Sequence, residues 1–139
     1  MIHFKKVEPT SDHLESLFAL LSKRKFSISH KKLPSKHEHE LFVKNHPYKD
    51  WFVIVESNDI IGSVYITFVN SFSIDLLPSK LHYFEEVVGW VYANFEPLSE
   101  KKSLIPNHLY INIPYKNKDF INRLKKMGLS PVQISFKKN

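Results

Sequence analysis

Cysteine is absent from this chain of 139 residues, and glycine occurs only three times. The lack of cysteine excludes disulfides, thiolate metal sites and cysteine nucleophiles, and it is compatible with a reducing compartment. The glycines, Gly62, Gly89 and Gly128, lie far apart in the sequence. A Walker A loop, a dinucleotide-binding fingerprint and a nucleophile elbow each need two glycines within a few residues, so the chain contains none of these motifs.

Long apolar runs are absent as well. No stretch approaches the roughly 18 residues that a membrane-spanning helix needs. The first residues, Met1 to Lys6, lack the apolar core of a signal peptide. We therefore expect a soluble cytoplasmic protein without a membrane partner. The length suits a single domain covering residues 1–139, and a hydrophobic content of 42% provides a core without disulfides.

Positive charge is concentrated in one segment. Residues 23–36 hold basic side chains and no acidic one, and the rest of the chain balances, so this segment accounts for the formal net charge of +6. Such a segment attracts phosphates, acidic peptides or nucleic acid, and a solvated lysine-rich loop is the simpler reading. Its single aromatic residue, Phe26, is too few for a stacking platform, which argues against nucleic acid as the ligand.

Three histidines, His37, His39 and His46, invite a metal interpretation. On a helix, chelating side chains must be three or four residues apart, and none of these pairs has that spacing. We therefore predict no metal site.

Apolar periodicity predicts alternating strands and helices. Asp12 with Glu15 has the form of a capping box for the first helix, and Gly128 is placed to end the last one. The order predicts an α/β fold with a mixed, mostly antiparallel sheet flanked by about four helices. Strands are expected at residues 2–7, 51–55, 60–69, 72–77, 109–113 and 132–136, and helices near 12–23, 36–46, 80–95 and 120–127.

This order resembles that of the GCN5-related N-acetyltransferases (GNAT family) over nearly the whole chain. Three stretches are similar to family motifs. The first is the hairpin from Trp51 to Thr67 with its Ile61-Gly62 step, and the second is the strand Ser71 to Pro78 followed by a helix. The third begins with Leu109-Tyr110-Ile111-Asn112 and continues with Asn117 and Lys126-Met127-Gly128-Leu129.

The resemblance implies an acetyl-CoA-dependent N-acyltransferase acting on an amine of a small molecule or a protein, with the basic segment favouring an acidic acceptor. In the family, a glycine-rich loop after the fourth strand holds the coenzyme A pyrophosphate. The corresponding loop here has no glycine, so Lys80 and His82 would contact phosphate through their side chains. The cofactor-binding residues implied by the resemblance are Leu76, Leu77, Ser79, Lys80, Leu81, His82, Asn112 and Asn117.

For catalysis, the resemblance points to a general base and a proton donor. Asp75 alternates away from its apolar neighbours on the strand and is the candidate base, although an exposed strand aspartate is the simpler interpretation. The tyrosine that donates a proton in many family members is replaced by Leu124, and Tyr115 is the nearby substitute. The alternative function is a catalytically inactive GNAT-like module that binds a protein or nucleic-acid partner through its basic surface.

Overall fold

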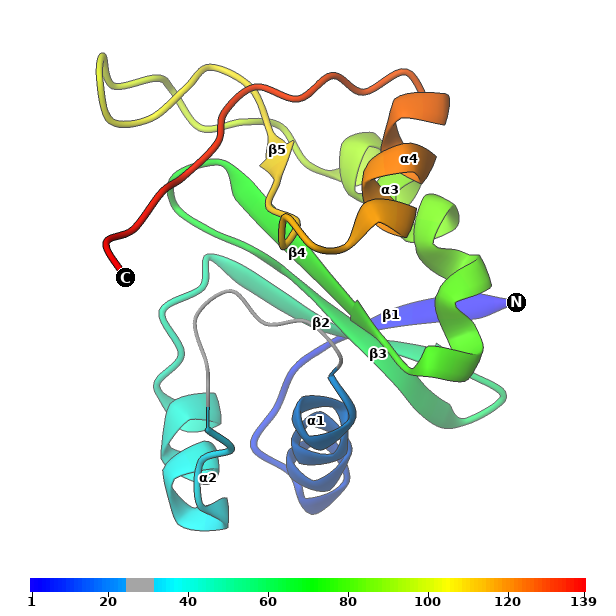
Figure 1. Cartoon of the computed structure of the whole chain (residues 1–139). Coiled ribbons are helices and arrows are strands. Elements are labelled where there is room, and N and C mark those ends of the chain that lie inside the picture. The colour runs from blue at the N-terminus through cyan, green and yellow to red at the C-terminus, as the bar shows by residue number, and fades with distance from the viewer. Residues whose placement is uncertain (25–31) are drawn as a thin grey trace.

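A five-stranded mixed sheet forms the centre of the protein, as a computed structural model shows for residues 1–24 and 32–139 (Figure 1). The strands lie in chain order, and the first four pair antiparallel while the last pair is parallel. Their bounds are β1 Ile2–Lys6, β2 Asp50–Glu56, β3 Asp59–Ile66, β4 Ser71–Leu76 and β5 Tyr110–Ile111. The predicted fold class is confirmed.

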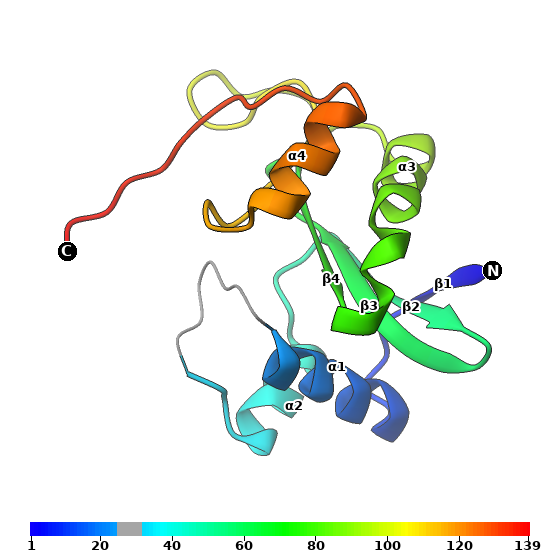
Figure 2. The ribbon, with the colours of Figure 1, turned by 45° about the vertical axis from the view of Figure 1, so that its right-hand side comes forward.

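Helices cover both faces of the sheet (Figures 1 and 2). Helices α1 and α2 lie on one face, and α3 and α4 lie on the other. A 3₁₀ helix, η1, joins β4 to α3. The bounds are α1 Ser11–Lys23, α2 Lys36–Lys44, η1 Pro78–Tyr83, α3 Phe84–Asn94 and α4 Lys118–Lys126. No helix in residues 1–24 and 32–139 is long and apolar enough to cross a membrane.

Strand β2 is apolar on both sides because both of its faces are covered, as its continuous apolar sequence predicted. Trp51, Val53 and Val55 pack against α1 and α2. Phe52 and Ile54 belong to the second core, under α3 and α4. That second core contains the largest fully buried side chains, Phe72 and Phe84. The sheet is therefore held between two cores that rest on opposite faces.

Two helix ends were predicted from the sequence: the cap at the start of α1 is wrong, and the end of α4 at Gly128 is confirmed. Thr10, and not Asp12, caps α1, with its hydroxyl accepting a bond from the His13 N–H. The reciprocal capping box lies at α2, between Ser35 and Glu38. At α4, Gly128 takes a φ of +92°, and the helix ends with paired 6→1 and 5→2 hydrogen bonds, the Schellman motif.

The predicted final strand, 132–136, is wrong. The residues after α4 form no strand and run along the outside of the molecule (Figure 1). Val132, Ile134 and Phe136 alternate as a strand would, yet their side chains are 63%, 78% and 92% exposed. The alternating pattern needs a paired edge to become a strand, and β5 offers only two paired residues. The predicted helix over 80–95 also differs, because its first turn is the separate helix η1.

Candidate functional site

The sheet opens between β4 and β5. The two strands pair only at Ser71 with Tyr110 and Phe72 with Ile111, and the last backbone bond runs from the Asn112 N–H to the Phe72 carbonyl, at 3.3 Å. Strand β4 continues to Leu76 with no partner on that side among the described residues. The gap therefore begins at Ser73 and widens toward Pro78.

The free edge of β4 carries backbone groups that face this gap. The Phe72 carbonyl points toward β5, and successive residues of a strand point their backbone groups to opposite sides. The amides of Ile74 and Leu76 therefore face the gap. The Leu77 N–H instead donates to the Ile61 carbonyl, at 2.9 Å. Leu76 and Leu77 were both predicted to bind the cofactor; the Leu76 amide has no backbone partner among the described residues, whereas the Leu77 amide is engaged in the sheet.

One cavity of about 800 Å³ passes through the gap. On the side of α1 and α2 it is lined by Arg24, Tyr65 and Asp75. On the side of α3 and α4 it is lined by Pro78, Leu81, Asn112, Asn117 and Phe120. The cavity therefore has lining residues on both faces of the sheet, with the splayed strands β4 and β5 between them; below, the part on the side of α1 and α2 is called the first chamber and the part on the side of α3 and α4 the second chamber.

Asp75 stands at this gap, paired with Arg24 from the end of α1. The Arg24 Nη2 lies 3.0 Å and Nε 3.3 Å from Asp75 Oδ2. The Asp75 side chain is only 18% exposed, so the reading of a solvent-facing strand aspartate is wrong. Burial raises the pKa of Asp75 above its ordinary value, and the Arg24 guanidinium opposes this shift. A carboxylate of raised pKa in a cavity is suited to take up a proton.

Aromatic side chains form the wall of the chamber next to Asp75. Tyr48 and Tyr65 stack with ring centroids 3.8 Å apart, and Trp51 meets Tyr48 edge to face at 5.1 Å. Phe42 of α2 closes the group. Burial raises the pKa of Tyr48 well above its ordinary value, so this phenol stays protonated. The chamber has a rigid, mainly apolar wall with one ion pair.

Helix η1 follows β4, at the place where the resemblance puts the pyrophosphate loop. Pro78 has no N–H, the Lys80 N–H donates to the Leu77 carbonyl at 2.8 Å, and the Phe84 N–H donates to the Leu81 carbonyl. These amides are therefore turned inward. The Lys80 Nζ lies 2.5 Å from Glu56, which also accepts a bond from the Tyr83 hydroxyl. Lys80 is thus engaged with the β2–β3 hairpin, and His82 is exposed.

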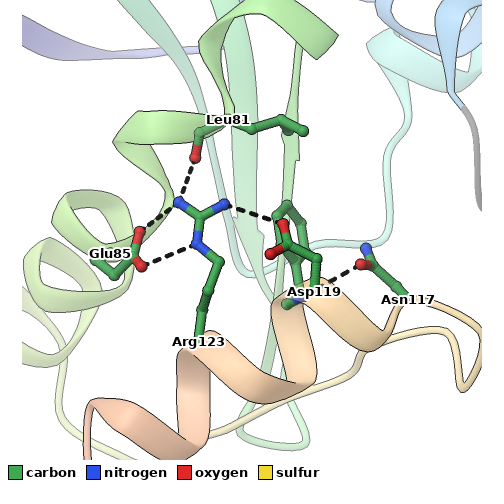
Figure 3. Close-up of polar contacts among 6 residues, drawn as sticks. Leu81, Glu85, Asn117, Asp119 and Arg123 are labelled. Atoms are coloured by element: carbon green, nitrogen blue, oxygen red, sulfur yellow. Dashed lines mark hydrogen bonds and ion pairs between the residues drawn. The ribbon is translucent and has the colours of Figure 1, made fainter.

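Arg123 of α4 joins this helix to α3 (Figure 3). Its guanidinium contacts both carboxylate oxygens of Glu85, at 2.9 and 2.5 Å, and donates to the Leu81 carbonyl at 2.6 Å. The guanidinium also lies 5.4 Å from the centre of the Phe84 ring and 5.5 Å from that of Phe120. The contact fixes the distance between α3 and α4, which bounds the second chamber.

The Glu85–Arg123 pair gives a pH-dependent prediction. The hydrogen bond from Arg123 lowers the pKa of Glu85 below its ordinary value. Its stabilisation is therefore present above the unfolded-state pKa and is lost as the pH falls through the folded-state pKa. Because Glu85 is 42% exposed, we expect Glu85→Gln to cost only about 0.5–1 kcal/mol at pH 7. Urea unfolding of both proteins should show this difference disappearing as the solution is made more acidic; a constant difference would contradict it.

The remaining predicted residues fall into two groups. Asn112 and Asn117 line the cavity, and the Asn117 side chain also caps α4 by accepting the Phe120 N–H. Tyr115, the suggested proton donor, is 73% exposed and does not line the cavity. Leu124 is buried in the core.

The histidines and the basic segment are only partly described. The His39 ring nitrogen Nε2 lies 3.1 Å from the Leu14 carbonyl, inside the protein. No group of three metal-binding side chains occurs in the described ranges. Of the basic segment, Lys23, Arg24 and Lys32 line the cavity, and residues 25–31 lie outside the described part of the chain.

Arg24 and Arg123 were missed by sequence reasoning. Arg24 reaches a partner 51 positions away, and Arg123 one 38 positions away. Arg24 was visible only as a member of the basic segment 23–36, and Arg123 only as a charged position of the last predicted helix. Nothing in the local sequence marks these two among the 20 basic residues of the chain.

Comparison with known proteins supports the fold. No protein-family model and no curated protein matches the sequence. Among solved structures, a transcriptional regulator from Bacillus halodurans is similar with a TM-score of 0.67 and 13% identity, covering 100% of this chain and 99% of the other. AAC(6')-Iy, in complex with a bisubstrate analogue, CoA-S-monomethyl-acetylneamine, has a TM-score of 0.65 and 12% identity, covering 100% and 98%.

A third similar structure was solved with acetyl coenzyme A bound. The N-acetyltransferase PseH of Campylobacter jejuni, in complex with acetyl coenzyme A, has a TM-score of 0.62 and 17% identity, covering 97% of this chain and 92% of the other. At these identities the comparison speaks to the fold. Together with the strand order and the open β4–β5 edge, it shows that this chain has the fold of the GNAT acetyltransferases.

Proposed function

We propose that this protein transfers an acetyl group from acetyl-CoA to an amine of a small molecule or a protein. The observation that carries the proposal is the cavity lined from both faces of the sheet, between β4 and β5. It presents a free strand edge to one reactant and a desolvated carboxylate, Asp75, to the other. Two reactants entering from opposite faces would meet at the gap, as a direct transfer requires.

The residues of this chain suggest a distribution of roles. The free backbone of Ile74 and Leu76 would bind an extended, amide-containing chain as an added strand. The amide of Leu76 would donate to the oxyanion that forms when the thioester carbonyl is attacked. Asp75 would accept the proton of the incoming amine, because only the neutral amine is a nucleophile. Asn112 and Asn117 would contact the donor from the opposite wall.

The site offers fewer contacts to the pyrophosphate of acetyl-CoA than to its extended pantetheine arm. Helix η1 uses the amides of Lys80 and Phe84 internally, and the Lys80 side chain is paired with Glu56. Ser79 and His82, both exposed, remain as phosphate contacts on this side. We therefore propose that phosphate is held by side chains more than by backbone amides, and that the arm supplies most of the affinity.

Binding of coenzyme A is the first test. A ligand at 100 times its Kd stabilises a protein by about 2.7 kcal/mol, which for a chain of this length raises Tm by several degrees. We expect this shift with coenzyme A and with its pantetheine arm alone. Release of free thiol from acetyl-CoA in the presence of a mixture of amines should follow. Absence of both signals would overturn the proposal and leave the non-catalytic binding module as the function.

A further inference from the structure

The Arg24–Asp75 ion pair lines the first chamber, on the side of α1 and α2. The side chains are 29% and 18% exposed, so both charges have lost most of their water. Two nitrogens of the Arg24 guanidinium, Nε and Nη2, donate to Oδ2 of Asp75. Within residues 1–24 and 32–139 no hydrogen bond engages the other oxygen, Oδ1. One carboxylate oxygen is therefore left for a further donor.

The pair restricts which amines can reach Asp75. An incoming ammonium group that displaces Arg24 from Asp75 leaves a poorly hydrated guanidinium without a counter-charge, which is costly. An acceptor that also carries an anion removes this cost, because the anion replaces Asp75 as the partner of Arg24. The exchange then conserves the net charge of the chamber. An acceptor with both charges is favoured over one with the amine alone.

The surroundings of the pair are compatible with the same acceptor. Lys23 and Lys32 also line this side of the cavity and add positive potential for the anionic end. The stacked rings of Tyr48 and Tyr65 leave a flat apolar wall for the rest of the molecule. Asp75 and Arg24 are in direct contact, so the amine and the anion must lie only a few bonds apart.

We propose that the acceptor is a small zwitterion, with a carboxylate or phosphate a few bonds from the amine, bound through Asp75 at the amine and Arg24 at the anion. This inference rests on the proposed acyl transfer and specifies its acceptor. An α-amino acid and an aminoalkyl phosphate share this chemistry, and the experiment separates them.

The test uses matched acceptors. Each α-amino acid is compared with its amide and with the corresponding amine lacking the carboxylate, and aminoalkyl phosphates are compared with aminoalkyl alcohols. Both binding, by calorimetry and thermal shift, and acetyl transfer are measured. We expect the zwitterions to bind at least about tenfold more tightly than the neutral-tailed amines, as one hydrogen bond to a charged group implies. The preferred pair identifies the anion as carboxylate or phosphate.

Variants assign the preference to Arg24. In Arg24→Gln, zwitterions and neutral-tailed amines should bind about equally tightly. Arg24→Lys, which keeps the charge, should restore part of the preference for zwitterions. Lys44→Gln removes the same charge from an exposed pair with Glu40 outside the cavity and should leave the preference unchanged. The proposal is overturned if simple amines are acetylated as well as zwitterions, or if Arg24→Gln keeps the preference. Failure of acetyl transfer with zwitterion binding retained would overturn the acyl-transfer function and leave the recognition site.

Discussion

Asp75→Asn is expected to lower kcat/KM for acetyl transfer by about 10²–10⁴-fold, the usual contribution of a positioned general base. The carboxylate lies at the gap between the two chambers, and burial raises its pKa, so it is poised to accept a proton. Asparagine keeps the size of the side chain and can still accept a hydrogen bond from Arg24. Because Arg24 also loses its counter-charge, the loss of rate is expected beside a loss of stability, and the rates are compared at a temperature where both proteins are folded.

The pH dependence distinguishes a base from a positioning group. As the pH falls through the raised pKa of Asp75, the wild-type carboxyl becomes protonated and can no longer act as a base. The ratio of wild-type to variant rate should therefore shrink toward acid. Asp59→Asn, the same change at an exposed residue of the β2–β3 hairpin, is the control and should be neutral. An Asp75→Asn protein within threefold of wild type across the pH range would rule out this role.

The fold was predictable because its apolar periods are strong and each satisfies a local rule. The alternation of Phe72 and Ile74 with polar residues on β4 specifies a strand with one covered face. The series Phe84, Val87, Val88 and Val91 specifies a helix lying on a core, and all four side chains are completely buried. The prediction of the last strand was wrong although its alternation is equally clear. A strand also needs a partner edge elsewhere in the fold, and a local pattern does not encode whether that edge is available.

Candidate residues could be selected from the sequence only where one strand and its turn determine their place. Asp75 and Leu76 were selected because they lie at the end of β4, and both line the cavity, while the roles predicted for them stay predictions. Arg24 was not found, because its pairing with Asp75 depends on how α1 crosses the sheet. The absence of glycine between β4 and α3 was visible in the sequence, and the structure forms η1 there. The engagement of Lys80 by Glu56 was not visible, since those residues are 24 positions apart.

Phe84→Ala should cost about 3–5 kcal/mol of unfolding free energy, as expected for deleting a fully buried aromatic side chain. Phe84 is 0% exposed at the start of α3, and its ring stacks on that of Phe120 with centroids 3.9 Å apart. The same ring lies under the Arg123 guanidinium. Its removal leaves a cavity and loosens the contact between α3 and α4.

A second substitution in the same helix provides the control. Gly89 is exposed in the middle of α3, and a Cβ there would meet nothing within 4 Å. Gly89→Ala should therefore stabilise the protein by about 0.5–1 kcal/mol through helix propensity alone. Equilibrium urea unfolding, compared at constant slope, measures both effects. A loss below about 1 kcal/mol in Phe84→Ala would contradict the prediction. If coenzyme A binds in the second chamber as proposed, its thermal shift should fall in Phe84→Ala and persist in Gly89→Ala, because α3 and α4 bound that chamber.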